Sequence, residues 1–164
     1  MCIRDRLYYG DREVVATTYD HLRRYVDYVE SKARDGVLSS YTPTARNENW
    51  MFIGDWARPA KVAGRGFNMD GTPEREFFNN CYRALLWQQL QDYAATLGRA
   101  DEVNRCKEHL AIIRPLIHNK FYNTEKGAYI FNNQSHLAMA LYAQIPPAEL
   151  RPKIMDSLLS LIHI

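Results

Sequence analysis

The chain has 164 residues, of which 46% are hydrophobic and 24% are charged, and its formal net charge is +2 at pH 7. This length and composition are typical of a single globular domain that buries a sizeable core. The small net charge offers no basis for binding nucleic acid, and no apolar run approaches the roughly 18 residues that cross a bilayer, so we expect neither nucleic acid nor a membrane as a partner.

The two ends of the chain are related at the level of DNA. One choice of codons for Met1 to Arg6 has a reverse complement that encodes Leu159 to Ile164. That DNA resembles the adapter of transposon-based sequencing libraries. We therefore expect residues 1–6 and 159–164 to be adapter artefacts, and residues 7–158 to be an internal piece of a longer domain. Without residues 1–6 the formal charge is +1. The true N-terminus is then unseen, which leaves the compartment open.

Apolar residues at helical spacing predict five helices. We expect them to run from about residue 11 to 34, 73 to 97, 101 to 121, 134 to 144 and 147 to 158. Thr72 at the N-cap and Pro73 at the first helical position give the second helix a clear start, and Asp101 is expected to cap the third. Pro115 is expected to kink the third helix or to end its regular part. A short extended run over residues 128–131 is the main strand signal.

A loop of about forty residues separates the first two helices, and loops of that length are uncommon in compact domains unless they carry function. It contains Trp50, Gly54, Asp55 and Trp56. A carboxylate can hold sugar hydroxyls while indole faces cover the apolar face of the sugar ring. Alternatively, Trp50 and Trp56 fill the end of a helical core and Asp55 caps a turn. The loop alone leaves both interpretations open.

Short connections require successive helices to run antiparallel. The tight turns near residues 98–101 and 145–147 therefore lie at one end of the helical stack, and the two longer loops lie at the other. This places the loop that carries the two tryptophans on the same rim as the loop with Asn133 and Gln134. A rim with indole, phenol, amide and carboxylate groups and little net charge suits a neutral, hydroxyl-rich ligand. We therefore expect a carbohydrate as the partner.

Several short runs match one known family in their order along the chain. They are Tyr9-Gly10-Asp11, Gly54-Asp55-Trp56, residues 94–101 (AATLGRAD), Tyr129, Gln134, residues 138–141 (AMAL) and residues 145–149 (IPPAE). Together they resemble the six-hairpin catalytic domain of bacterial α-L-rhamnosidases over almost all of residues 7–158. The resemblance implies an all-α fold that forms part of an (α/α)6 toroid, built of antiparallel helical hairpins, with the sugar bound at one mouth.

The resemblance also implies a glycoside hydrolase that removes terminal α-L-rhamnose with inversion, using a general acid and a general base roughly 6.5–9.5 Å apart. It implies sugar contacts from Asp55, Trp56, Trp50, Gln134 and Asn133. The family's acid lies in a carboxylate-rich segment that ends in Gly-Trp-x-Gly-Asp and precedes the matched part, and its base is a later glutamate. We therefore expect neither in this chain, and we expect the isolated chain to bind rhamnose weakly if at all and to hydrolyse nothing. In an alternative register, Glu48 is the proton donor.

Simpler interpretations stand beside these. Asn133 and Gln134, just before a helix, can serve to satisfy its free N–H groups. The His and Cys residues lack metal-ligand spacing, so we predict no metal and no cofactor, and we expect Cys81 and Cys106 to be buried free thiols. One rival function is another six-hairpin enzyme, acting on uronic acid, fucose, glucose or trehalose units. An α-solenoid interaction module is a second rival, although no repeat of about 34 or 40 residues is visible. The oligomeric state stays open.

Overall fold

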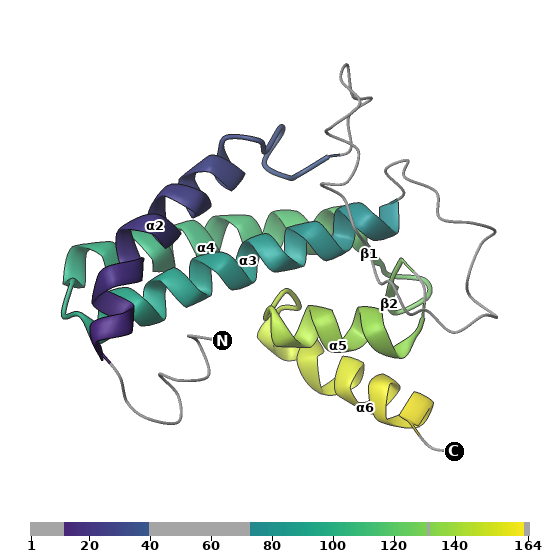
Figure 1. The fold of residues 1–164 in the computed structure, drawn as a ribbon. Helices are drawn as coiled ribbons and strands as arrows, with labels where there is room; N and C mark the ends of the chain where they lie inside the picture. Colours follow the sequence, from purple (N-terminus) through teal and green to yellow (C-terminus); the bar gives the residue numbers. More distant parts are fainter. Residues whose placement is uncertain (1–11, 40–72, 131, 163–164) are drawn as a thin grey trace.

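The computed structural model describes residues 12–39, 73–130 and 132–162, and these parts of the chain are mostly helical (Figure 1). The helices are α2 (Arg12–Glu30), α3 (Pro73–Thr96), α4 (Ala100–Phe121), α5 (Gln134–Tyr142) and α6 (Arg151–Ile162), with a 3₁₀ turn η2 (Ala148–Leu150) before α6. Two short strands, β1 (Tyr122–Asn123) and β2 (Ala128–Tyr129), pair antiparallel between α4 and α5. The all-α class predicted from helical spacing is confirmed.

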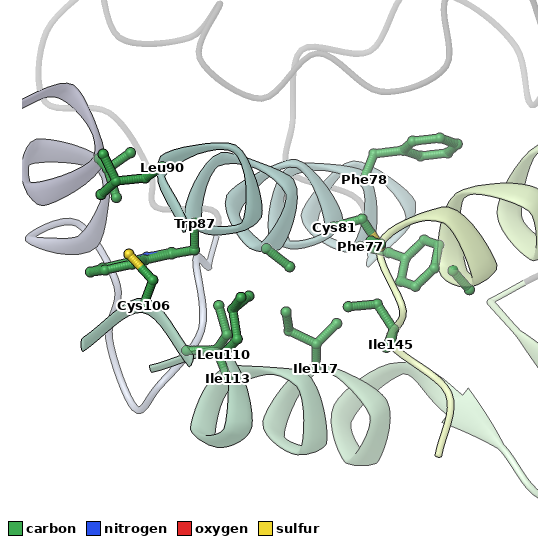
Figure 2. Close-up of a cluster of buried hydrophobic side chains, with 14 of the residues drawn as sticks. Phe77, Phe78, Cys81, Trp87, Leu90, Cys106, Leu110, Ile113, Ile117 and Ile145 are labelled. Carbon is green, nitrogen blue, oxygen red and sulfur yellow. The ribbon is translucent and has the colours of Figure 1, made fainter. Parts of the chain in front are cut away.

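Helix α3 is the central element of the stack. It packs along α4, its antiparallel neighbour, and it also contacts α2 and α5 (Figure 1). Its large buried side chains Phe77, Trp87 and Leu90 recur at helical spacing. Figure 2 shows Ile113 and Ile117 of α4 facing α3 across this core. Burying each side chain of this size stabilises the fold by about 1.5–3 kcal/mol relative to exposure, so the core joins α3 and α4 firmly.

The predicted alternation of short and long connections is confirmed for the described residues. The turn between α3 and α4 and the connection between α5 and α6 lie at one end of their hairpins, whereas the start of α3, the β1–β2 hairpin and the start of α5 gather at the other (Figure 1). Phe77 near the start of α3 stacks on Tyr129 of β2 with ring centroids 5.2 Å apart. Phe78 lies 5.1 Å from the ring of His136 in α5. We call this end of the stack the rim.

One local expectation for α4 is wrong, and one of the two alternatives for Pro115 is excluded. Arg99 rather than Asp101 is the N-cap residue, and its side chain makes no capping hydrogen bond. Asp101 lies in the first turn, where its negative charge still favours the helix N-terminus. The helix also continues through Pro115 to the end of α4 instead of stopping there. Ile113 and Ile117 are buried on either side of this proline, and their packing offsets the cost of a proline inside a helix.

Other bounds differ from expectation by a few residues. Helix α2 ends at Glu30, because the chain then turns back in a tight loop closed by a bridge between Arg34 and Val37. The extended run is confirmed over Ala128–Tyr129, but its partner strand was not predicted. The last helix begins at Arg151 after the 3₁₀ turn and runs to Ile162.

Gly36 occupies a backbone conformation that L side chains rarely adopt. Its φ is +78°, and a Cβ at this position would lie 2.6 Å from Cδ1 of Leu116. We expect Gly36→Ala to destabilise the fold by about 1–2 kcal/mol, mainly because of the backbone strain. Gly98 is the matched control, since its φ is +72° but nothing lies within 4 Å of its Cβ position. Urea unfolding should show the larger loss for Gly36→Ala; a larger loss for Gly98→Ala would contradict the crowding by Leu116.

Candidate functional site

Two of the residues predicted to bind a sugar, Asn133 and Gln134, lie at the rim. The others, Trp50, Asp55 and Trp56, and the alternative proton donor Glu48, lie outside the described residues. Oδ1 of Asn133 accepts a hydrogen bond from the backbone N–H of His136 at 3.0 Å, so Asn133 is the N-cap of α5. Nε2 of Gln134 donates to the carbonyl oxygen of Leu161 at 2.6 Å and ties the start of α5 to the end of α6. A sugar contact for either residue stays a prediction.

A buried carboxylate and a buried imidazole meet beside Asn133. Oε1 of Glu74, in the first turn of α3, lies 3.7 Å from Nε2 of His136 in α5. Nδ1 of the same imidazole contacts Oδ1 of Asn133, and the ring packs near Phe78. We call Glu74, Phe78, Asn133 and His136 the rim cluster. The side chains of Glu74 and His136 are only 7% and 0% exposed, so both are buried where α5 begins beside α3.

Two exposed amides lie at the rim where α5 begins. Asn132 and Gln134 are both exposed at the start of α5. A side-chain amide offers both hydrogen-bond donors and an acceptor, which is the combination that sugar hydroxyls require. These two amides can therefore hydrogen-bond to hydroxyl groups, and the buried members of the rim cluster lie beside them.

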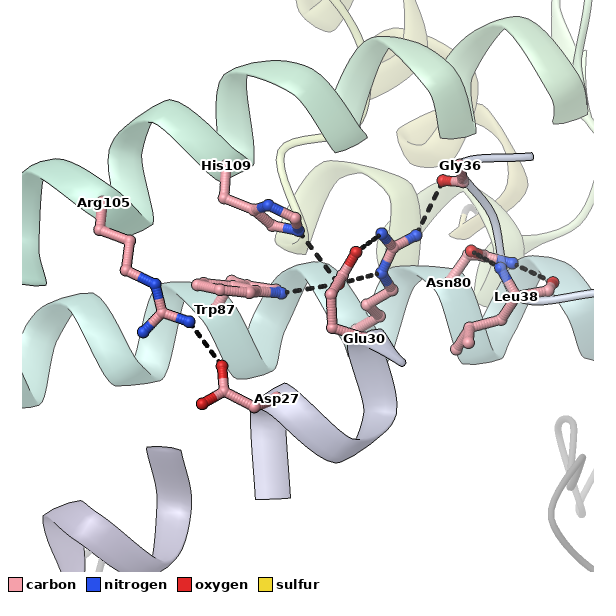
Figure 3. Close-up of polar contacts among 9 residues, drawn as sticks. Asp27, Glu30, Gly36, Leu38, Asn80, Trp87, Arg105 and His109 are labelled. Atoms are coloured by element: carbon pink, nitrogen blue, oxygen red, sulfur yellow. Dashed lines mark hydrogen bonds and ion pairs between the residues drawn. The ribbon is translucent and has the colours of Figure 1, made fainter. Parts of the chain in front are cut away.

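A second polar cluster joins α2, α3 and α4. Oε2 of Glu30 accepts hydrogen bonds from Nε of Arg83 at 2.8 Å and from Nε1 of Trp87 at 3.1 Å (Figure 3). Arg83 also binds the other carboxylate oxygen, which makes the ion pair bidentate. Nε2 of His109 lies 3.0 Å from Oε2 of Glu30, and the imidazole stacks on Trp87 with centroids 4.0 Å apart. We call Glu30, Arg83, Trp87 and His109 the anchor cluster.

The anchor cluster continues into contacts that hold the chain after α2 onto α3. Nη1 of Arg83 donates to the carbonyl oxygen of Gly36 at 2.9 Å. One turn earlier on α3, Asn80 pairs with both backbone groups of Leu38: Oδ1 accepts from the N–H and Nδ2 donates to the carbonyl, each at 2.8 Å (Figure 3). Leu38 is therefore fixed on α3 shortly before residues 40–72, which contain the predicted sugar-binding tryptophans.

Sequence reasoning missed most of these polar residues. Glu74 precedes Phe77 and Phe78 by three and four positions, so the three share one helix face, and this spacing could have indicated that the carboxylate is buried. Asn80 and Arg83 interrupt the apolar face of α3 in the same way. What the spacing cannot supply is the partner of each polar side chain, because Glu30 and Arg83 are 53 positions apart.

The unfolding free energy should depend on pH through Glu30. Burial alone raises the pKa of Glu30, but hydrogen bonds and positive charge from His109 and Arg83 more than offset this and lower that pKa from 4.5 to about 2. A lowered folded-state pKa contributes stability above pH 4.5 that is lost as the pH falls towards 2. We expect a loss on the order of 2 kcal/mol over this range, allowing for solvent screening. Urea unfolding across these pH values should show a weaker pH dependence for Glu30→Gln; an unchanged dependence would contradict this assignment.

The capping role of Asn133 can be separated from a sugar contact. We expect Asn133→Ala to destabilise the fold by about 1 kcal/mol, because the amide oxygen caps α5. Serine caps helices about as well as asparagine, so Asn133→Ser should retain most of the stability. The change in Tm on thermal unfolding reports how much the cap contributes to stability. The sugar affinity of the Ser variant reports whether the amide also contacts a ligand. Equal destabilisation by Ala and Ser would contradict the capping role.

The two thiols are buried and free, as predicted. Burial raises the pKa of Cys106 to about 11 and also raises the pKa of Cys81, so both thiols stay protonated at neutral pH. Among the described residues, no group of three His, Cys, Asp or Glu side chains is placed to hold a metal ion. In the same parts of the chain, no helix has both the length and the apolar character that a membrane span requires.

The sequence matches one family model along nearly its whole length. The model is that of the bacterial alpha-L-rhamnosidase 6 hairpin glycosidase domain, and the match extends over residues 1–163. No curated protein has a sequence that matches this chain.

Three solved structures resemble the fold. The alpha-L-rhamnosidase of Streptomyces avermitilis complexed with L-rhamnose is 21% identical with a TM-score of 0.66, over 93% of this chain and 13% of that one. The alpha-L-rhamnosidase of Dictyoglumus thermophilum is 22% identical with a TM-score of 0.70, over 92% and 15%. The native enzyme of Aspergillus terreus is 18% identical with a TM-score of 0.66, over 93% and 17%. At these identities the likeness establishes the fold, and the chain spans only a small part of each enzyme.

Proposed function

The chain belongs to the family of bacterial α-L-rhamnosidase six-hairpin glycosidase domains, and from this we propose that it is part of a glycoside hydrolase that removes terminal α-L-rhamnose from glycans or glycosides. Its helical hairpins form part of an (α/α)6 toroid, as the resemblance implied. The observation that carries the proposal is the family match over residues 1–163, supported by the same fold in three α-L-rhamnosidases.

We propose that the sugar binds at the rim. The loop with Trp50, Asp55 and Trp56 would supply indole faces and a carboxylate, and Asn133 and Gln134 would supply amides. Two observations support this arrangement: the chain entering the loop is fixed on α3 by Asn80, and the start of α5 is fixed by the rim cluster. L-Rhamnose is neutral and carries a methyl group, so an indole can cover part of its surface while amides and a carboxylate hold its hydroxyls.

Inverting hydrolysis requires a general acid and a general base, and we propose that both lie outside this chain. Two glutamates near the rim have structural partners: Glu74 lies beside His136, and an oxygen of Glu76 lies 3.4 Å from Nζ of Lys120. These pairs favour structural roles for both glutamates. Glu48 remains the alternative proton donor within the chain.

Hydrolysis of an aryl α-L-rhamnoside tests this function. We expect the isolated chain to give no turnover and the longer protein encoded by the source gene to release rhamnose, with the product anomer inverted by NMR. Asp55→Asn in that protein should raise KM, because a group that holds sugar hydroxyls is weakened. Turnover by the isolated chain would place the catalytic carboxylates within it and so contradict the proposal. Turnover of a uronide, fucoside, glucoside or trehalose instead of the rhamnoside would support the rival six-hairpin enzymes.

A further inference from the structure

A groove with a volume of about 370 Å³ lies between α4 and the connection from α5 to α6, at the opposite end of α5 from the rim. Its positively charged lining residues are Lys107 and Arg114 of α4 and Arg151 at the start of α6. Its amide-bearing lining residues are Gln91, Asn119 and Gln144. Among the described residues that line the groove, none carries a carboxylate. Neither Asn133 nor Gln134, which are proposed to bind the sugar, lines this groove.

The two arginines of the groove are held in place by neutral groups. Nε of Arg114 donates to the carbonyl oxygen of Ala143 at 3.1 Å, and its Nη2 donates to Oε1 of Gln88 at 3.0 Å. Nε of Arg151 donates to the carbonyl oxygen of Pro146 at 3.0 Å. Each side chain is therefore anchored through Nε, which leaves further guanidinium N–H groups to donate elsewhere.

Within the described residues, neither arginine forms an ion pair with a carboxylate. Burial and then the positive charge of Arg151 lower the pKa of Arg114, so the two cations repel each other. Burial lowers the pKa of His118, which lines the groove, and the negative charge of Glu149 partly opposes this shift. Glu149 itself is not a lining residue. Like charges held together in a partly buried groove are stabilised when an anion lies between them.

We propose that this groove binds a tetrahedral oxyanion, phosphate or sulfate, either free or as an ester on a sugar. Arg114 of α4 and Arg151 of α6 line the groove from two elements, and Lys107 is a third cation in its lining, so guanidinium and ammonium groups are available as donors. A tetrahedral anion offers acceptor oxygens in several directions and can use all three, whereas a planar carboxylate is best matched by one guanidinium. This site does not depend on the rhamnosidase function.

The test is an NMR titration of the ¹⁵N-labelled chain with inorganic phosphate at constant ionic strength. We expect saturable shifts at the side-chain Nε–Hε groups of Arg114 and Arg151, with sodium chloride giving none. Lys107→Gln should weaken phosphate binding roughly tenfold, the loss expected for one charge-assisted contact. Lys126→Gln is the matched control, because it removes one exposed positive charge from the β1–β2 turn and should leave affinity unchanged.

A parallel titration with glucose 6-phosphate separates the two sources of the anion. Tighter binding than inorganic phosphate identifies a sugar ester as the ligand, and equal binding identifies the free anion; both support an oxyanion site. Three results would overturn it: shifts spread over the basic surface, equal shifts with chloride, or equal weakening by Lys126→Gln and Lys107→Gln. Tighter binding of glucuronate than of phosphate would overturn the tetrahedral preference.

Discussion

Replacing Arg83 with leucine is expected to destabilise the fold by roughly 3–5 kcal/mol, because it leaves a partly buried carboxylate without its cation. The side chain of Arg83 is 2% exposed and that of Glu30 is 26% exposed. The change also removes the donor to the carbonyl oxygen of Gly36, so the segment after α2 loses one of its contacts with α3. Urea unfolding followed by circular dichroism measures the loss. Amide hydrogen exchange should report faster opening at Leu38.

Arg105→Gln is the matched control for Arg83→Leu. Arg105 pairs with Asp27 on the same side of the helical stack, but these side chains are 40% and 43% exposed. Exposed ion pairs contribute about 1 kcal/mol or less, so we expect a small loss. A loss as large as that of Arg83→Leu would mean that surface charge, rather than the buried anchor cluster, holds α2 in place.

Phe77→Ala is expected to cost roughly 3–5 kcal/mol, the usual range for truncating a fully buried phenylalanine. The ring is 0% exposed. It meets the ring of Phe121 edge-on at 5.7 Å, stacks on Tyr129 at 5.2 Å and lies 5.7 Å from His136. It therefore joins α3, α4, β2 and α5 at the rim, and thermal unfolding should show a strongly lowered Tm.

Tyr82→Ala provides the comparison on the same helix. Tyr82 is 54% exposed, and surface substitutions usually change stability by less than about 0.5 kcal/mol. Similar losses for Tyr82→Ala and Phe77→Ala would contradict the packing of the rim around Phe77. If Phe77→Ala also weakens sugar binding in the longer protein while Tyr82→Ala does not, the rim is further supported as the binding end.

Much of the fold was predictable because its signals are local. Apolar spacing and turn residues such as Gly98 and Pro146 are read directly from the sequence, and they predicted the helices and the alternation of their connections. At Pro115 a local preference opposed packing, and the buried neighbours on α4 outweighed it, since the cost of a proline inside a helix is smaller than the gain from an apolar face along the helix. The N-cap at Arg99 instead of Asp101 is a difference of two positions, which helical spacing does not determine.

The polar clusters were not predictable in the same way. Helical spacing can indicate that Asn80, Arg83 or Glu74 faces the core, but it cannot indicate what each contacts. Leu38 and Asn80 are 42 positions apart, and they meet only because α2 folds back along α3. For the sugar site, the alternation of short and long connections correctly predicted that Asn133 and Gln134 lie at the rim. Their sugar contacts stay predictions. The described residues do not include Trp50, Asp55, Trp56 or Glu48.

The most direct test of the central claim, that this chain is part of an α-L-rhamnosidase whose catalytic carboxylates lie outside it, is to read the source DNA outward from both ends. We predict that the upstream flank encodes a carboxylate-rich segment ending in Gly-Trp-x-Gly-Asp. We also predict that the downstream flank continues the helical hairpins to a further glutamate. A start codon and a stop codon close to the two ends would contradict the claim, and the rim would then have to be explained as the binding surface of a small helical protein.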